Sequence, residues 1–115
     1  MKVVSQRLRD SARGRECTLR LPGVCNFDPA TTVLCHIPVN QRGMGIKSPD
    51  IAACFACSSC HDAADGRTPY NISAWDWLRA LIETQMIWIA EGLLTVEGMK
   101  EKPYKPLQKI VARRI

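Results

Sequence analysis

Apolar residues recur every three or four positions in the C-terminal half of the chain, the spacing of one face of an α-helix. The repeat consists of Trp75, Leu78, Ile82, Met86, Ile89 and Leu93. Ser73 is placed to cap such a helix, although Asp76 stands where a capping box usually has Glu or Gln, and Gly92 is placed to end it. The pattern predicts a long helix over residues 73–91 whose apolar stripe packs on the core.

Two shorter stretches upstream have the composition of β-strands. Residues 31–37 are rich in β-branched and apolar side chains and end at Pro38, and residues 51–56 form a second apolar run. Because side chains alternate along a strand, Cys35 and His36 are expected on opposite faces of the first one. The two runs together predict a two-stranded hairpin.

Short helices are expected on either side of this hairpin. Residues 57–65 follow the second strand directly and predict a short helix that Gly66 ends in the C′ position. Residues 5–13 predict a loose basic helical arm. With the long helix packed across the hairpin, we expect an α+β fold in one domain over residues 1–115.

The net charge of +5 is concentrated at the two ends of the chain. Residues 1–20 carry +4, residues 21–98 carry −4 and residues 99–115 carry +5. Basic ends favour contact with nucleic-acid phosphates, although a solvated basic surface is the plainer interpretation. No run of eighteen apolar residues predicts a membrane span, and residues 1–13 are too charged for a secretory signal. We therefore expect a cytoplasmic protein.

The six cysteines are better explained as metal ligands than as disulfides, because a reducing compartment disfavours disulfides. Cys57 and Cys60 form a Cys-x2-Cys turn, which supplies two ligands to a tetrahedral zinc ion with little strain. A Pro-Gly turn between Cys17 and Cys25 can bring these two together as the second pair. We predict a structural zinc site made of these four residues. The alternative is a secreted module held together by disulfides.

Cys35 and Cys54 remain, and both lie in predicted strands. They are interpreted as small buried apolar residues. A competing assignment takes Cys54 and Cys57 as the zinc knuckle, since their spacing is also two residues. The position of Cys57 and Cys60 at the strand-to-helix turn favours the latter pair.

Each of the two histidines lies beside one of these features. His61 directly follows the zinc knuckle, and one of its ring nitrogens could bind a divalent ion. His36 lies near the end of the first predicted strand and could act as a general base on water, since the unperturbed pKa of histidine lies near neutrality. Nearby polar residues could complete a metal shell or orient a ring: Asp50, Asp62, Asp65 and Asn40.

In these motifs the chain resembles the HNH, or ββα-metal, endonucleases, through the pattern Cys17…Cys25…Cys35-His36-Ile37-Pro38…Cys57-Ser58-Ser59-Cys60-His61. It is most similar to the small YbcO-like nucleases found in prophages. The similarity covers about residues 11–93 and leaves out the basic tail over residues 99–115. It implies a ββα-metal core and a metal-dependent endonuclease that hydrolyses DNA in the cytoplasm of a bacterium or a phage-infected host.

The same resemblance implies roles for individual residues. His36 matches the histidine that activates water, and His61 matches a ligand of the catalytic ion, which could be Mg²⁺, Mn²⁺ or Zn²⁺. The four cysteines match the structural zinc site. Cys35 stands where many of these enzymes carry an acidic ligand, so Asp50 is the expected further catalytic residue, followed by Asn40. No small-molecule cofactor is expected.

DNA is the expected partner, and its phosphates are expected to contact basic residues of the N-terminal region and of the loop over residues 38–50. These residues are Arg13, Arg15, Arg42 and Lys47. The alternative function is a non-catalytic, zinc-stabilised DNA-binding or recombination-accessory protein. Both functions predict zinc and DNA binding. Only the nuclease predicts divalent-ion-dependent cleavage that His36→Ala abolishes.

Overall fold

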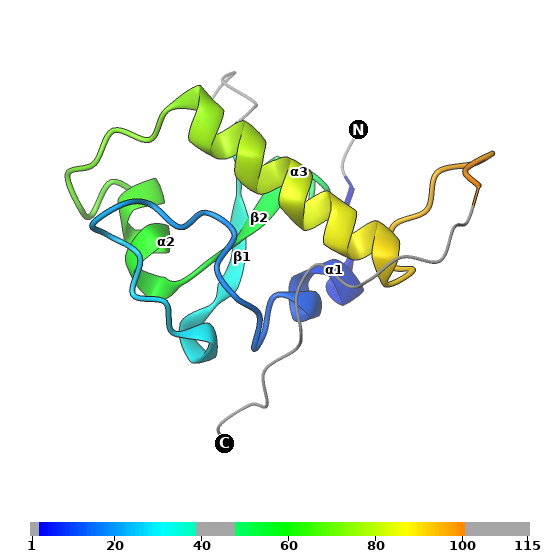
Figure 1. Ribbon diagram of the computed structural model, residues 1–115, viewed down its shortest axis with the longest axis horizontal. Coiled ribbons are helices and arrows are strands. Elements are labelled where there is room, and N and C mark those ends of the chain that lie inside the picture. Colours follow the sequence, from blue (N-terminus) through cyan, green and yellow to red (C-terminus); the bar gives the residue numbers. More distant parts are fainter. Residues whose placement is uncertain (1–2, 39–47, 101–115) are drawn as a thin grey trace.

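The computed structural model describes residues 3–38 and 48–100, which form a small α+β protein around a two-stranded antiparallel sheet (Figure 1). In chain order the elements are α1 (Gln6–Ser11), the 3-10 helix η1 (Pro29–Thr31), β1 (Val33–His36), β2 (Ala53–Ala56), α2 (Ser58–Ala64) and α3 (Ala74–Ala90). The α+β class and the order of the elements are confirmed. The expectations for Asn40, Arg42, Lys47 and residues 101–115 concern positions outside the described residues. Over the described ranges, no helix is long and apolar enough to span a membrane.

The hairpin is shorter than the sequence predicts. β1 and β2 pair with Cys35 opposite Cys54 and His36 opposite Ala53. The first strand was expected from residue 31, but Thr31 belongs to η1, which the side chain of Asp28 caps. An Asp-Pro pair is a strong start for a helical turn, and here it outweighs the β-branched composition of the residues that follow. The second strand begins two residues later than expected, after a turn.

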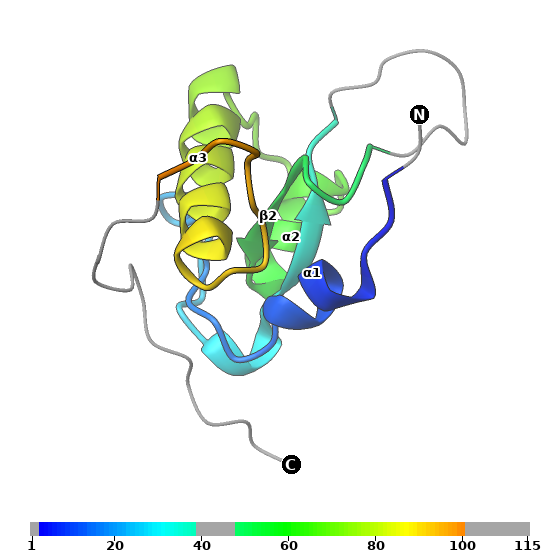
Figure 2. The same cartoon turned by 90° about the vertical axis from the view of Figure 1, so that its right-hand side faces the viewer.

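The helices lie on both sides of this hairpin. α3 packs against β2, whereas α1 packs against β1. Figure 2 shows α3 along one side of the sheet and α1 on the other. α2 follows β2 after Cys57 alone, whose sulfur accepts the N–H of Cys60 and so caps the helix. Gly66 has a φ of 80°, the left-handed conformation that ends a helix, as expected.

The capping box of α3 is confirmed. The side chain of Ser73 accepts the N–H of Asp76, and the Asp76 carboxylate accepts the N–H of Ser73. The shorter carboxylate therefore completes the box in place of the usual Glu or Gln. The helix ends at Ala90, and Gly92, with a φ of 73°, follows.

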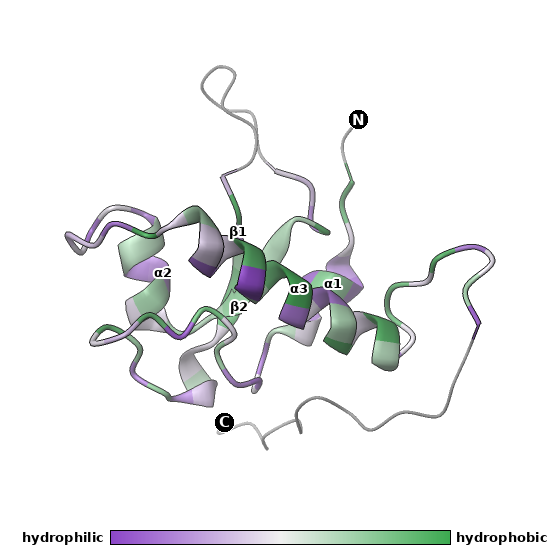
Figure 3. Cartoon of the chain, turned by 45° about the horizontal axis from the view of Figure 1, so that its top comes forward, coloured by the Kyte–Doolittle hydropathy of each residue, from purple (hydrophilic) through white to green (hydrophobic). Residues whose placement is uncertain are grey.

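The apolar stripe of α3 faces away from the core, so the sequence-based orientation of this helix is wrong. Four of its six members are exposed: Trp75 (72 %), Leu78 (45 %), Ile82 (53 %) and Met86 (38 %). The buried residues of α3 are instead Ala80, Thr84, Ile87 and Trp88. Figure 3 shows hydrophobic residues recurring along the length of α3, consistent with more than one apolar face.

Small and polar side chains explain why α3 docks through its other face. Ala80 is fully buried, and a residue of this size lets the helix approach its neighbours closely. The hydroxyl of Thr84 pairs with that of Thr18 at 2.8 Å, which satisfies two buried polar groups together. At the C-terminal end, Trp88 packs edge-on against Phe55 of β2, with ring centroids 6.1 Å apart. Trp88 therefore fixes the C-terminal end of α3 against the sheet, and the small side chains of Ala80 and Thr84 allow close packing along the rest of the helix.

Candidate functional site

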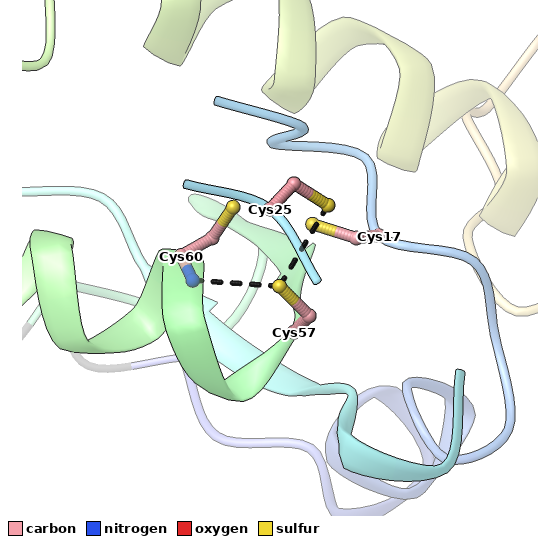
Figure 4. Close-up of side chains that lie close together, drawn as sticks. All are labelled: Cys17, Cys25, Cys57 and Cys60. Atoms are coloured by element: carbon pink, nitrogen blue, oxygen red, sulfur yellow. Dashed lines mark hydrogen bonds between the residues drawn. The ribbon is translucent and has the colours of Figure 1, made fainter. Parts of the chain in front are cut away.

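Four cysteines from two distant segments direct their sulfur atoms toward one centre (Figure 4). Cys17 and Cys25 come from the loop that precedes η1, and Cys57 and Cys60 come from the start of α2. The four sulfur atoms all lie within 4.8 Å of one another, and those of Cys25 and Cys57 are 3.7 Å apart. Tetrahedral zinc, with Zn–S bonds of about 2.3 Å, needs sulfurs roughly 3.8 Å apart. The cluster therefore has the size and the chemistry of a metal site, and the predicted ligand set is the one that comes together.

The backbone around the cluster is shaped to hydrogen-bond sulfur. The N–H of Arg20 donates to Cys17 Sγ at 3.3 Å, and the N–H of Leu21 donates to Cys60 Sγ at 3.4 Å. Arg20 and Phe27 have φ values of 40° and 55°, which side-chain-bearing residues adopt only at a cost. Both lie within three residues of a cluster cysteine. N–H donors favour the ionised thiolate, which is the form that binds a metal.

Hydrogen bonds and burial within the cluster give its thiols different pKa values. The hydrogen bond with Cys60, assisted by backbone N–H groups and opposed by burial, lowers the pKa of Cys17 to about 5. The same hydrogen bond, together with burial, raises the pKa of Cys60. Burial also raises the pKa of Cys25 to about 11. One thiolate is therefore favoured at neutral pH, and the remaining thiol protons must leave when a dication binds.

The two other cysteines lie outside this cluster. Cys35 and Cys54 face each other across the hairpin and are 2 % and 0 % exposed. Their interpretation as small buried residues is confirmed. Among the described residues the metal-binding group contains Cys57 and Cys60 but not Cys54, so the competing knuckle is not formed.

A second constellation surrounds His36 at the end of β1. Its Nε2 lies 2.7 Å from Oδ1 of Asp50, a carboxylate that is 1 % exposed. Oδ2 of Asp50 accepts the backbone N–H of Ser5 at 2.7 Å and the Nε–H of Arg9 at 3.0 Å. Burial opposes ionisation of Asp50, but the hydrogen bonds from His36, Ser5 and Arg9 and the charge of Arg9 outweigh it, and the pKa of Asp50 is lowered. Asp50 is thus an ionised anchor for the imidazole.

A cavity of about 760 Å³ lies in front of this histidine. Its lining comes from α1, β1 and α2 and the loops beside them, and it includes both histidines, His36 and His61. The folding of β1, β2 and α2 as one unit is what brings together two residues that are 25 positions apart in the sequence. Arg9, Arg13 and Asp65 line the same cavity.

His61 sits on α2 with an acidic neighbour one turn later. Its Nδ1 lies 3.6 Å from Oδ2 of Asp65, and its side chain is 34 % exposed. Asp62 instead pairs with Arg67 at 3.1 Å on the surface, and that arginine lies 3.7 Å from Asp65 as well. Of the three acids considered from the sequence, Asp50 therefore serves His36 and Asp65 faces His61.

Arg15 is not a surface residue, which argues against its expected contact with DNA. The side chain is 2 % exposed, and its Nη2 forms an ion pair with Glu91 just after α3. The guanidinium carbon lies 5.9 Å from the centre of the Phe55 ring. Phosphates cannot reach it there. Arg13, two residues earlier, is exposed and lines the histidine cavity.

Sequence reasoning assigned no role to Arg9, although it lies in the predicted basic arm. The four-residue spacing of Arg9 and Arg13, which brings side chains to one face of a helix, was the available signal. This signal was hard to recognise because Arg7 and Arg15 lie nearby, and the four arginines together form no single helix face.

Comparisons with known proteins show the family of the chain. The family described as "Putative nuclease YbcO" matches residues 6–93. A protein of that name from Escherichia coli K12 is 46 % identical over 91 residues, which is 76 % of this chain and 95 % of the relative. A protein of the same name from Enterobacteria phage 82 shows the same identity and coverage.

A solved structure with a related sequence has the same fold. It is described as a putative bacteriophage protein from E. coli K-12 MG1655, and it is 44 % identical to this chain. The superposition has a TM-score of 0.60 and covers 75 % of this chain and all of the other. The matched region contains the four cysteines and both histidines. The chain therefore belongs to the YbcO family of putative nucleases.

Proposed function

We propose that this protein is a metal-dependent endonuclease of the HNH, or ββα-metal, type that hydrolyses phosphodiester bonds in DNA. The observation that carries the proposal is that His36 and His61 line one cavity, with the buried Asp50 bound to His36. The hairpin followed directly by α2 supports the type, because it is the β-β-α order that the resemblance implies. The coarser nuclease function is supported by the names of the relatives.

His36 is proposed as the general base. An ionised carboxylate accepts a hydrogen bond, so the Asp50 contact places the proton of the neutral ring on Nε2. Nδ1 is then the nitrogen that can accept a proton from water. Asp50 also stabilises the imidazolium that results, because its negative charge lies 2.7 Å away in a buried position. Asp50 is thus proposed as a positioning residue and not as a metal ligand.

His61 is proposed as a ligand of the catalytic ion through Nε2. Metal-bound histidines usually donate their other N–H to a carboxylate or a carbonyl, and Asp65 stands on the Nδ1 side of this ring. Mg²⁺, Mn²⁺ or Zn²⁺ bound here would supply Lewis-acid stabilisation of charge on the phosphate and the leaving oxygen. The four-cysteine cluster is proposed to hold a separate zinc ion that stabilises the fold.

DNA contacts are proposed to be mainly electrostatic. Arg13 lies at the cavity, and Arg42 and Lys47 belong to the basic segment that lies between β1 and β2 in the sequence. Contacts of this kind give salt-sensitive binding with little sequence preference.

A plasmid-nicking assay with each divalent ion tests the proposal. Wild type is expected to convert supercoiled plasmid to nicked or linear forms. His36→Gln places an amide N–H near the position of Nε2, where it can donate to Asp50, but it cannot take a proton from water at neutral pH, so cleavage is expected to fall by about 10²-fold or more. DNA affinity and zinc content should stay unchanged. If wild type binds DNA but cuts with none of the ions, the protein is the non-catalytic DNA-binding alternative.

A further inference from the structure

Asp50 connects His36 to a second cationic side chain. One carboxylate oxygen faces Nε2 of His36 at 2.7 Å, and the other accepts Nε–H of Arg9 at 3.0 Å. The carboxylate is 1 % exposed and also accepts the N–H of Ser5. The imidazole and the guanidinium are thus fixed relative to each other by one buried group.

The outer end of Arg9 remains free to bind a ligand. A guanidinium has five N–H donors, of which the Asp50 contact uses the single one on Nε. Within the described part of the chain, no hydrogen bond or ion pair engages the Nη groups of Arg9. The side chain is 44 % exposed and lines the same cavity as His36 and His61. Its remaining donors can therefore reach a ligand in that cavity.

The surroundings of Arg9 favour an anion. Arg13 lies four residues further on and lines the same cavity. Two acids, Asp10 and Asp65, line it as well, so it is the donors of Arg9 and not the net charge of the lining that favour an anion. A guanidinium offers paired donors that match the oxygens of a phosphate, and a carboxylate behind it fixes its plane.

We propose that Arg9 binds a backbone phosphate of the nucleic acid directly beside His36, and that Asp50 holds both side chains in register. The inference rests on the proposed nuclease function and specifies how its substrate is placed. A phosphate held by Arg9 would be positioned relative to the general base through a single carboxylate. Positioning of this kind converts binding energy into rate.

Binding of a fluorescein-labelled 20-base-pair DNA duplex, measured by anisotropy at several salt concentrations, tests the inference. The measurement is made in the His36→Gln background, so that cleavage does not intervene and the contact with Asp50 is kept. Arg9→Gln is expected to weaken binding by about 10-fold and to reduce the salt slope by about one ion. Arg7→Gln is the matched control, since Arg7 has the same charge, lies on the same helix and is exposed, but does not line this cavity. It should change affinity by less than about threefold, with the slope retained.

Equal effects of Arg9→Gln and Arg7→Gln would overturn the inference. If Arg9→Gln does not fold, Arg9→Lys keeps the charge but loses the Nη donors, and binding as tight as wild type would then count against the proposal. Failure of the nuclease function looks different. In that case the protein with His36 intact binds DNA through Arg9 but never cuts it. Cleavage by wild type together with full activity of Arg9→Gln would contradict only the Arg9 inference.

Discussion

At the scale of single residues, burial separates arginines that look alike in the sequence. Arg13 and Arg15 stand two positions apart, and both were expected to contact DNA. One is exposed at the cavity, whereas the other is enclosed with Glu91 and the face of Phe55. Nothing local distinguishes them, because the partner that buries Arg15 follows α3, 76 residues further along the chain. Residue type alone could not have predicted this difference.

The charge of Asp50 also depends on partners that are distant in the sequence, and its effect on stability can be measured. Its pKa is lowered in the folded protein, below the value of about 3.9 expected for an unfolded chain. Ionised Asp50 therefore stabilises the fold fully above the unfolded pKa, and this contribution is lost as the pH falls through the folded pKa. Asp50→Asn should lower the free energy of unfolding by about 2 kcal/mol or more at pH 7, because it leaves Arg9 and His36 without their anion.

Urea unfolding of wild type and Asp50→Asn at pH 7, where the cysteine cluster is expected to keep its ion, measures this effect. The acid end of the pH range is limited to values at which both proteins still hold their metal, because loss of the ion would unfold them. Within this range the difference in unfolding free energy is expected to persist, since it lies above the unfolded pKa of Asp50. Equal stability of the two proteins at pH 7 would show that Asp50 is not ionised in the way described.

At the scale of elements, the largest difference between the sequence-based prediction and the structure is the orientation of α3. Its helical nature, its capping box and its end could be predicted, because these depend on neighbouring residues. Its orientation could not, because two faces of the helix carry apolar residues and hydrophobic spacing favours the one with more of them. The other face is buried because Ala80 permits close approach and Thr84 meets a hydroxyl from a distant loop.

Paired substitutions in α3 test this orientation. Ile87 is 1 % exposed and Ile82 is 53 % exposed, five residues earlier on the same helix. Ile87→Ala is expected to cost about 2–4 kcal/mol of unfolding free energy, since it opens a cavity beside Trp88 and Phe55. Ile82→Ala should stay within about 0.5 kcal/mol, because it removes little buried surface and alanine favours the helix. Chemical unfolding measures the loss of stability in each variant. A larger loss for Ile82→Ala than for Ile87→Ala would show that the apolar stripe faces the core after all.

At the scale of the whole molecule, the metal cluster was predictable and the histidine site only in part. Cys57 and Cys60 have the spacing of a zinc knuckle, and Cys17 and Cys25 flank a Pro-Gly turn, so two pairs that could share one ion were recognisable. The link between His36 and Asp50 was one of several possibilities, because Asn40, Asp62 and Asp65 were also candidates to orient a ring or complete a metal shell. The contact of Arg9 with Asp50 spans 41 residues and depends on how the N-terminal segment folds back. No local pattern encodes a contact of that range.

The cluster's position makes a prediction about the entire fold. Cys17 and Cys25 belong to the N-terminal half, and Cys57 and Cys60 lie at the start of α2, so a bound ion closes a loop of some forty residues. The core available to so small a protein is limited, and structural zinc contributes of the order of 10 kcal/mol in small domains. We therefore expect one tightly bound zinc per chain in the cysteine cluster, and a strong chelator should abolish cooperative thermal unfolding or lower its midpoint by tens of degrees. Because binding requires thiolates, mild acid should release the ion as well.

Cys17→Ala and Cys35→Ala separate the metal from the mere loss of a buried sulfur. Both residues are almost fully buried, but only Cys17 lies in the cluster. Cys17→Ala should lose the zinc and the unfolding transition together. Cys35→Ala should keep one zinc per chain and shift the transition by a few degrees at most, because it removes a single small side chain. Elemental analysis and calorimetry on the two purified variants give the answer. Stoichiometric zinc in Cys17→Ala, or equal destabilisation of both, would mean that the ion does not hold these two segments together.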